Sequence, residues 1–147
     1  MKHIIHLVAA ITATLCIGTF FFSSIIVELT GTNDSIAAVK SLILFPGLFI
    51  LIPAIAAAGG TGFLLARNRT GRLVEKKKKR MPFIGINGIF ILLPAAIVLN
   101  YWASNGLLDT RFYLVQGLEL IAGAINLTLM GMNIRDGFKL AGKLRPK

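Results

Sequence analysis

An acidic residue inside an apolar segment is the feature of this sequence that points most directly to chemistry. Glu119 lies in the stretch FYLVQGLELIAGAINLTLMGMN, which covers residues 112–133. Burying a carboxyl group in apolar surroundings is costly, so we expect it either to have a functional role or to be a neutral acid that is hydrogen-bonded for packing. We expect Gln116, Asn100 and Tyr101 nearby, and no Lys, Arg or His at the same depth.

Glu119 belongs to a regular stripe of mainly polar residues. The stripe consists of Gln116, Glu119, Gly123, Asn126, Met130 and Asn133. Steps of three and four residues place them on one face of a helix at about 100° per residue. We expect this face to meet the bundle interior or a partner subunit, along a first-helix strip of Thr12, Cys16, Thr19 and Ser23. Its amides would serve as hydrogen bonds between helices, worth about 1 kcal/mol each, or as a substrate path.

The two histidines form a second candidate site. His3 and His6 stand one helical turn apart near the N-terminus, and Met130 and Met132 are expected at a similar depth. A His/Met axial pair is a known arrangement for haem iron. A metal site made from His3 and His6 alone lacks ligands, and the alternative is that both histidines lie at the headgroup level of a bilayer.

The elements that must position these residues are apolar helices. The chain has 147 residues, of which 55% are hydrophobic, and a formal net charge of +10. Long apolar runs alternate with short basic segments, which is the pattern of a membrane protein. The lone Cys16 excludes an internal disulfide and a zinc cluster. Four predicted spans cover residues 4–27, 41–66, 82–103 and 112–134.

Charge distribution predicts the orientation. Of the sixteen Lys and Arg residues, only Lys40 and Arg111 fall outside Lys2, the 67–80 loop and the 135–147 tail. The positive-inside rule therefore predicts that both termini and this loop are cytoplasmic. The short connections predict an all-α integral membrane four-helix bundle, running up-down-up-down as a single domain. We expect the bacterial cytoplasmic (inner) membrane as its location.

The second and third spans share a sequence pattern. GLFILIPAIAA occupies residues 47–57 and GIFILLPAAIV residues 88–98, which is either an inverted repeat or a coincidence of common membrane residues. Pro53 and Pro94 would kink their helices and open a gap at the bundle centre. Gly59, Gly60 and Gly62 are expected to let another helix approach closely.

A basic cluster precedes the third span. Its residues are Lys76, Lys77, Lys78, Lys79 and Arg80. Such a cluster beside a bilayer attracts anionic lipid headgroups and also sets topology. The segregation of charge from the apolar runs makes nucleic acid an unexpected partner.

Two segments resemble a known group of proteins. HLVAAITATLCIGTFFFSS and LFPGLFILIPAIAAAGGTGFLLA, within residues 6–66, are similar to small four-helix bacterial inner-membrane proteins. That group is distantly like the copper-resistance D-type and the haem-biosynthesis (protoporphyrinogen-oxidising) membrane proteins. The resemblance implies a four-helix fold and, at the position of His6, a haem ligand. This chain departs from the pattern because it has no histidine after residue 6 and no lysine within a predicted span.

No nucleophile–base pair, carboxylate pair or multi-ligand metal site stands out, so an enzyme is not the expected class. The leading expectation is a non-enzymatic, oligomeric membrane protein that packs through its polar helix face and binds a lipid or a partner subunit. One alternative is a haem- or tetrapyrrole-binding redox protein that uses His6. A further alternative is a small proton-coupled carrier or channel that uses Glu119.

Overall fold

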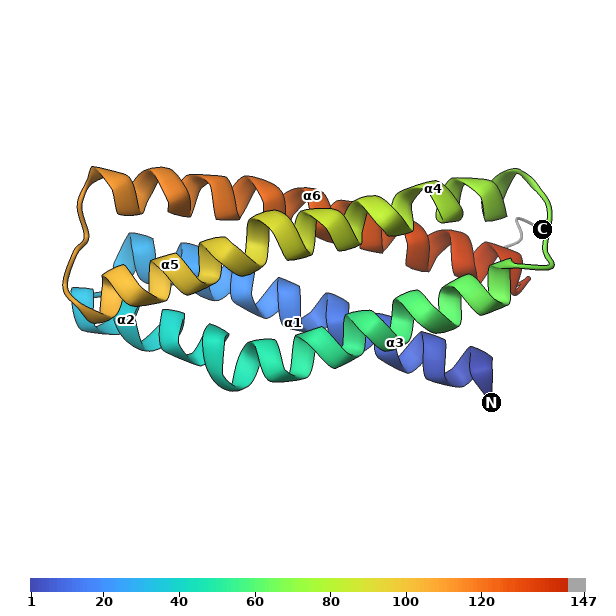
Figure 1. The fold of residues 1–147 in the computed structure, drawn as a ribbon, viewed down its shortest axis with the longest axis horizontal. Helices are drawn as coiled ribbons and strands as arrows, with labels where there is room; N and C mark the ends of the chain where they lie inside the picture. The colour runs from blue at the N-terminus through green and yellow to red at the C-terminus, as the bar shows by residue number, and fades with distance from the viewer. Residues whose placement is uncertain (143–147) are drawn as a thin grey trace.

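The computed structural model describes residues 1–142, and within them the chain forms four long helical rods (Figure 1). The first rod is α1 (Lys2–Thr30). The second consists of α2 (Asn33–Leu42), the π-helical segment η1 (Ile43–Gly47) and α3 (Leu48–Ala66). The third consists of α4 (Arg72–Asn87), the π-helical segment η2 (Gly88–Leu92) and α5 (Leu93–Ser104). The fourth rod is α6 (Thr110–Leu140).

Consecutive rods run in opposite directions and pack as a four-helix bundle (Figure 1). The N-terminus, the connection between α3 and α4, and the C-terminal end of α6 lie together at one end, on the right in Figure 1. The connections before α2 and before α6 lie at the other end. We call these the basic end and the opposite end. The expected all-helical bundle is therefore present in the described residues.

The outer surface of the bundle is apolar. All four rods are long and apolar enough to cross a membrane, judged by length and composition. Large hydrophobic side chains point outward, with Phe49, Phe90 and Leu114 each at least 70% exposed. A helix that is apolar on its outward face as well as its inward face suits a lipid environment. These features are compatible with a multi-pass membrane protein.

The rods are longer than the predicted spans. The second begins at Asn33 rather than residue 41, because Thr32 caps α2 by accepting a hydrogen bond from the Ser35 amide at 3.3 Å. Most of the predicted 67–80 loop is helical, since α4 starts at Arg72. Asp109 caps α6 by accepting from the amides of Arg111 and Phe112. The predicted tail is helical as far as Leu140, and its residues 143–147 lie outside the described part.

The break in helical geometry also differs from the prediction. Phe45 has φ −140° and ψ 121°, and the kink comes there, before Pro46, whereas Pro53 lies within α3. Pro94 is the second residue of α5, which follows the π-helical segment η2. Proline lacks the amide hydrogen that continues the ladder, so an irregular turn on its N-terminal side is expected.

The buried face of α1 is one position away from the predicted strip. Ala13, Ile17 and Ser24 are buried, whereas Thr19 is exposed. The small side chain of Ala13 lets a neighbouring helix approach closely. The predicted packing strip on α1 is therefore wrong in register.

Candidate functional site

A buried ion pair joins α2 and α6 toward the opposite end of the bundle. Lys40 Nζ lies 2.7 Å from Glu119 Oε2, and the Lys40 side chain has no exposed surface. The ammonium group also donates to Ser24 Oγ of α1 at 3.1 Å. The prediction that no cation lies at the depth of Glu119 is wrong, as is the assignment of Lys40 to an outer loop. The two opposite charges compensate each other's burial in this contact.

Gln116 completes this group, which we call the Lys40 cluster: Ser24, Lys40, Gln116 and Glu119. Glu28 lies one helical turn beyond Ser24 on α1. Gln116 Nε2 donates to Glu119 Oε2 at 3.1 Å, as the sequence suggested. Asn100 instead accepts a hydrogen bond from Ser41, and Tyr101 is 62% exposed. Glu28 Oε1 and Gln116 Oε1 are both buried and have no hydrogen-bond partner among the described residues.

A cavity of about 230 Å³ adjoins the Lys40 cluster in the middle of the bundle. Its wall is mainly apolar, and Ser24, Glu119 and Asn126 contribute the polar atoms. The two π-helical segments also contribute, through Ile43 of η1 and Gly88 of η2. A central gap was expected at Pro53 and Pro94, but neither proline lines this one.

Paired asparagines connect α4 and α6 at mid-bundle. Asn87 Nδ2 donates to Asn126 Oδ1 and to the Ala122 carbonyl, each at 2.9 Å. Asn126 Nδ2 donates to the Ile84 carbonyl at 3.3 Å, and its side chain is fully buried. The predicted polar stripe therefore faces the interior of the same chain. Asn87 and Asn126 satisfy each other and two backbone carbonyls.

A second ion pair lies toward the basic end. Arg80 Nη1 lies 2.7 Å from Asp136 Oδ2 and 3.4 Å from Asn133 Oδ1. Asp136 is 2% exposed, and Arg135 Nη2 lies 3.7 Å from its other oxygen. Arg80 was predicted to contact lipid headgroups, but its guanidinium group points to α6 instead.

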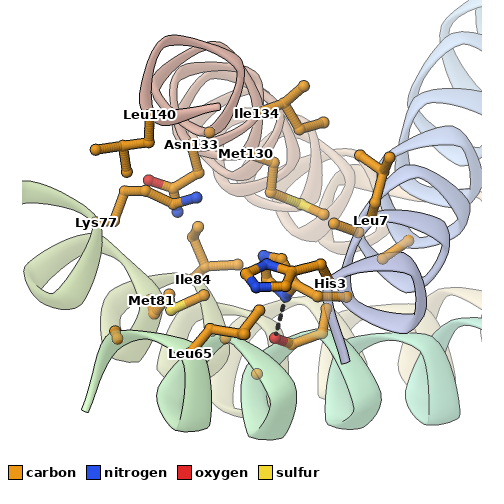
Figure 2. Close-up of a pocket in the computed structure, with 18 of the residues that line it drawn as sticks. His3, Leu7, Leu65, Lys77, Met81, Ile84, Met130, Asn133, Ile134 and Leu140 are labelled. Atoms are coloured by element: carbon orange, nitrogen blue, oxygen red, sulfur yellow. Dashed lines mark hydrogen bonds between the residues drawn. The ribbon is translucent and has the colours of Figure 1, made fainter. Parts of the chain in front are cut away.

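A pocket of about 570 Å³ opens between all four rods at the basic end, and we call it the basic-end pocket. Figure 2 shows its apolar walls, to which Leu7, Leu65, Ile84 and Ile134 each contribute from a different rod. His3, Arg69, Lys77 and Asn133 also line it. An apolar cavity with a few convergent polar groups is the usual form of a small-molecule site.

The predicted haem ligands meet partly in this pocket. His3, His6 and Met130 line it, whereas Met132 does not. His6 Nδ1 lies 3.0 Å from the Ala58 carbonyl and 3.2 Å from Thr61 Oγ1. A carbonyl partner makes Nδ1 the donor, which leaves Nε2 as the nitrogen with a lone pair. Among residues 1–142, no three His, Cys, Asp or Glu side chains come together as a metal site.

The basic cluster divides into buried and exposed members. Lys77 lies against α6, with its Nζ 3.2 Å from where a Cβ on Gly137 would stand, and no carboxylate of the described chain lies within 4 Å of it. Lys76, Lys78 and Lys79 are exposed. Lys77 is therefore the member of the cluster that can act inside the pocket.

The three glycines of α3 have different surroundings. A Cβ on Gly62 would collide with Met81 and would stand 3.0 Å from His6, so close packing does occur there. Gly59 and Gly60 are exposed, and nothing described lies within 4 Å of a Cβ added to either. Within the chain, only Gly62 of the three is needed for close helix contact.

Sequence reasoning missed Lys40, Asn87 and Asp136 as members of polar contacts. Lys40 was excluded because a charged residue ended the apolar run. The Thr32 cap and the helical spacing of Ile36, Lys40 and Ile43 are the signals that could have placed it inside a helix.

Comparisons with protein families, with curated proteins and with solved structures found no match to this chain. The resemblance of residues 6–66 therefore rests on those residues alone.

Proposed function

We propose that this chain is a multi-pass protein of the bacterial cytoplasmic membrane that binds an amphiphile with an anionic headgroup in the basic-end pocket. The role is binding rather than catalysis. The observation that carries the proposal is the pocket itself: an apolar space of about 570 Å³ that has Lys77 and Arg69 on its lining.

The orientation follows from the position of the charges. Apart from Lys40 and Arg111, every described Lys and Arg belongs to α1's first residue, the α3–α4 connection, the start of α4 or the end of α6. Those segments gather at the basic end (Figure 1). The positive-inside rule then supports a cytoplasmic basic end, next to the leaflet that attracts cationic side chains most strongly.

The chemistry of the ligand follows from the pocket lining. The walls from α1, α3, α4 and α6 are aliphatic and suit acyl or isoprenoid chains. Lys77 and Arg69 suit a phosphate or carboxylate headgroup, to which ammonium and guanidinium groups donate charge-assisted hydrogen bonds. Phosphatidylglycerol has both parts and is a suitable probe.

Native mass spectrometry of the detergent-purified protein tests the proposal. We expect the wild type to retain phosphatidylglycerol in preference to phosphatidylcholine. Lys77→Gln removes one cation near the headgroup, worth about 1 kcal/mol, so affinity for phosphatidylglycerol should fall about fivefold. Gly62→Leu places a side chain in the pocket and should abolish retention.

Matched controls are available on the same helices. Lys79→Gln changes an exposed lysine that does not line the pocket, and Gly60→Leu adds a side chain at an open position outside the pocket lining. Both should bind like the wild type. Equal retention of the two lipids by the wild type, or an equal loss in Lys79→Gln and Lys77→Gln, would contradict the proposal.

The lining also supports a second candidate, a tetrapyrrole. His6 has its Nδ1 directed to the Ala58 carbonyl, the arrangement that orients a ligating histidine, and Met130 lines the same pocket. The visible spectrum of protein purified in mild detergent separates this candidate from the first. A Soret band that is lost in His6→Ala would support it, and protein that stays colourless on titration with haem would exclude it.

A further inference from the structure

The basic-end pocket shares part of its wall with a second cavity. The cavity of about 230 Å³ beside the Lys40 cluster, which we call the central cavity, is lined by Ile55 of α3 and Gly85 of α4. The same two residues line the basic-end pocket. A Cβ added to Gly85 would meet no atom of a neighbouring helix within 4 Å, so there is open space beside this residue. The two cavities therefore follow one another from the basic end to the middle of the bundle.

We propose that the amphiphile bound in the basic-end pocket extends one hydrocarbon chain past Ile55 and Gly85 into the central cavity. This inference rests on the proposed function and adds which part of the ligand the middle of the bundle holds. The ligand is then an anionic lipid whose chain is long enough to reach from the basic end to mid-bundle.

The distance between the two sites fits one lipid chain. Gly88, which lines the central cavity, lies eleven residues after Lys77 on the third rod, or about 16 Å at 1.5 Å per residue. The hydrocarbon core of a bilayer is about 30 Å thick and has two leaflets, so the chains of one leaflet span about 15 Å. A headgroup at Lys77 therefore places the end of its chain at the depth of the central cavity.

The walls of the central cavity suit a hydrocarbon. Each of the four rods contributes aliphatic side chains, among them Ile17, Leu51, Leu92 and Leu120. An apolar cavity of about 150 Å³ is enough to bind benzene. The central cavity, at about 230 Å³, therefore has room for a longer hydrocarbon segment.

The polar residues that line the central cavity are engaged within the chain. Ser24 and Glu119 both bind Lys40. Asn126 binds Asn87 and a backbone carbonyl of α4. The headgroup therefore belongs with the cations of the basic-end pocket, and the hydrocarbon belongs in the central cavity.

The central cavity also reaches the outer surface of the bundle. Ile52 of α3 and Ile89 of η2 line it and are 51% and 59% exposed. Both side chains belong to the apolar outer surface that suits lipid. A lipid chain can therefore enter sideways from the bilayer, and the headgroup does not have to cross the bundle.

Photo-cross-linking with a modified lipid tests the proposal. The probe is phosphatidylglycerol that carries a diazirine at the methyl end of one palmitoyl chain, mixed into phosphatidylcholine vesicles that contain the full-length protein. Peptide mass spectrometry then locates the adducts. We expect adducts on Ile17, Leu51 and Ala96, which line the central cavity and are each 8% exposed or less, so that lipid on the outer surface does not reach them.

Variants on the third and second rods sharpen the test. Gly88→Leu adds a side chain to the central cavity, where a Cβ would stand 3.9 Å from Asn126 Nδ2. It should lose the adduct on Leu51 but still retain phosphatidylglycerol in native mass spectrometry, because Gly88 does not line the basic-end pocket. Gly60→Leu, at an exposed position outside both linings, should give the wild-type adducts.

The wild type alone can overturn the proposal. Adducts confined to outward-facing residues such as Phe49 and Leu114, or to the basic-end pocket, would do so. Equal adducts on Leu51 from a phosphatidylcholine probe with the same chain would also do so, because the chain would then enter without help from the headgroup. With preferential retention of phosphatidylglycerol intact, these results reject only the placement of the chain. Loss of that preference rejects the proposed function itself.

Discussion

The Lys40–Glu119 and Arg80–Asp136 pairs have the same separation of 2.7 Å but opposite surroundings. Around Lys40, one carboxylate pairs with one cation, and the cation is completely buried. Around Asp136, one carboxylate has two cations within 4 Å, and the Arg80 side chain is 15% exposed. The opposite half therefore holds a balanced, buried ion pair, whereas the basic end has an excess of cations.

The difference shows how each half manages its charges. At the basic end, surplus cations can reach solvent or lipid phosphates by extending their long side chains. The Lys40 cluster has no such outlet, so Lys40 and Glu119 must balance each other's charge inside the bundle. The first arrangement suits contact with an anionic ligand, and the second suits a buried contact that joins α2 to α6.

Breaking the buried pair should have the largest effect. Lys40→Met leaves Glu119 without its cation in an apolar interior, and we expect a loss of about 3–5 kcal/mol in the free energy of unfolding. Thermal and denaturant unfolding in detergent measure it. Lys79→Met, at an exposed lysine, is the matched control and should have no measurable effect.

The double variant Lys40→Met/Glu119→Leu sharpens this prediction. Removing both charges together should recover much of the stability, because neither group is left unpaired. If Lys40→Met alone unfolds like the wild type, the pair does not exist in the folded protein.

Breaking the Arg80–Asp136 pair at the basic end should lower the free energy of unfolding by a smaller amount. Asp136→Asn removes a carboxylate whose cationic partners can turn toward solvent or lipid, and we expect a loss of about 1.5–3 kcal/mol. The same unfolding assay measures it. A loss as large as that of Lys40→Met would show that the two halves do not differ in the way described.

Removing the uncharged contact between Asn87 and Asn126 should lower the free energy of unfolding least. Asn126→Ala removes the hydrogen bonds to Asn87 and to the Ile84 carbonyl, and we expect a loss of about 1 kcal/mol. Thr128→Ala, on the exposed face of α6, is the control. An effect comparable to that of Asp136→Asn would mean that polar burial, rather than charge, determines the energetic difference.

The helices and the inward polar face could be predicted from hydropathy and from the three–four spacing of Gln116, Glu119 and Asn126. The partner of Glu119 could not, because hydropathy ends a span at a charged residue while the helix continues through it. Lys40 is eight residues past the Thr32 cap, and its aliphatic stem lies inside the bundle. The basic-end pocket could not be predicted either, because its walls come from all four rods and its size depends on how the rods pack together.

Cysteine accessibility tests most directly the central claim that the two ends face opposite sides of a bilayer. In a Cys16→Ala background, Thr70→Cys marks the basic end and Ser104→Cys the opposite end, both at exposed positions. In intact spheroplasts, a membrane-impermeant maleimide should label Ser104→Cys at once and Thr70→Cys only after lysis. Labelling of both positions before lysis, or the reverse pattern, would contradict the account.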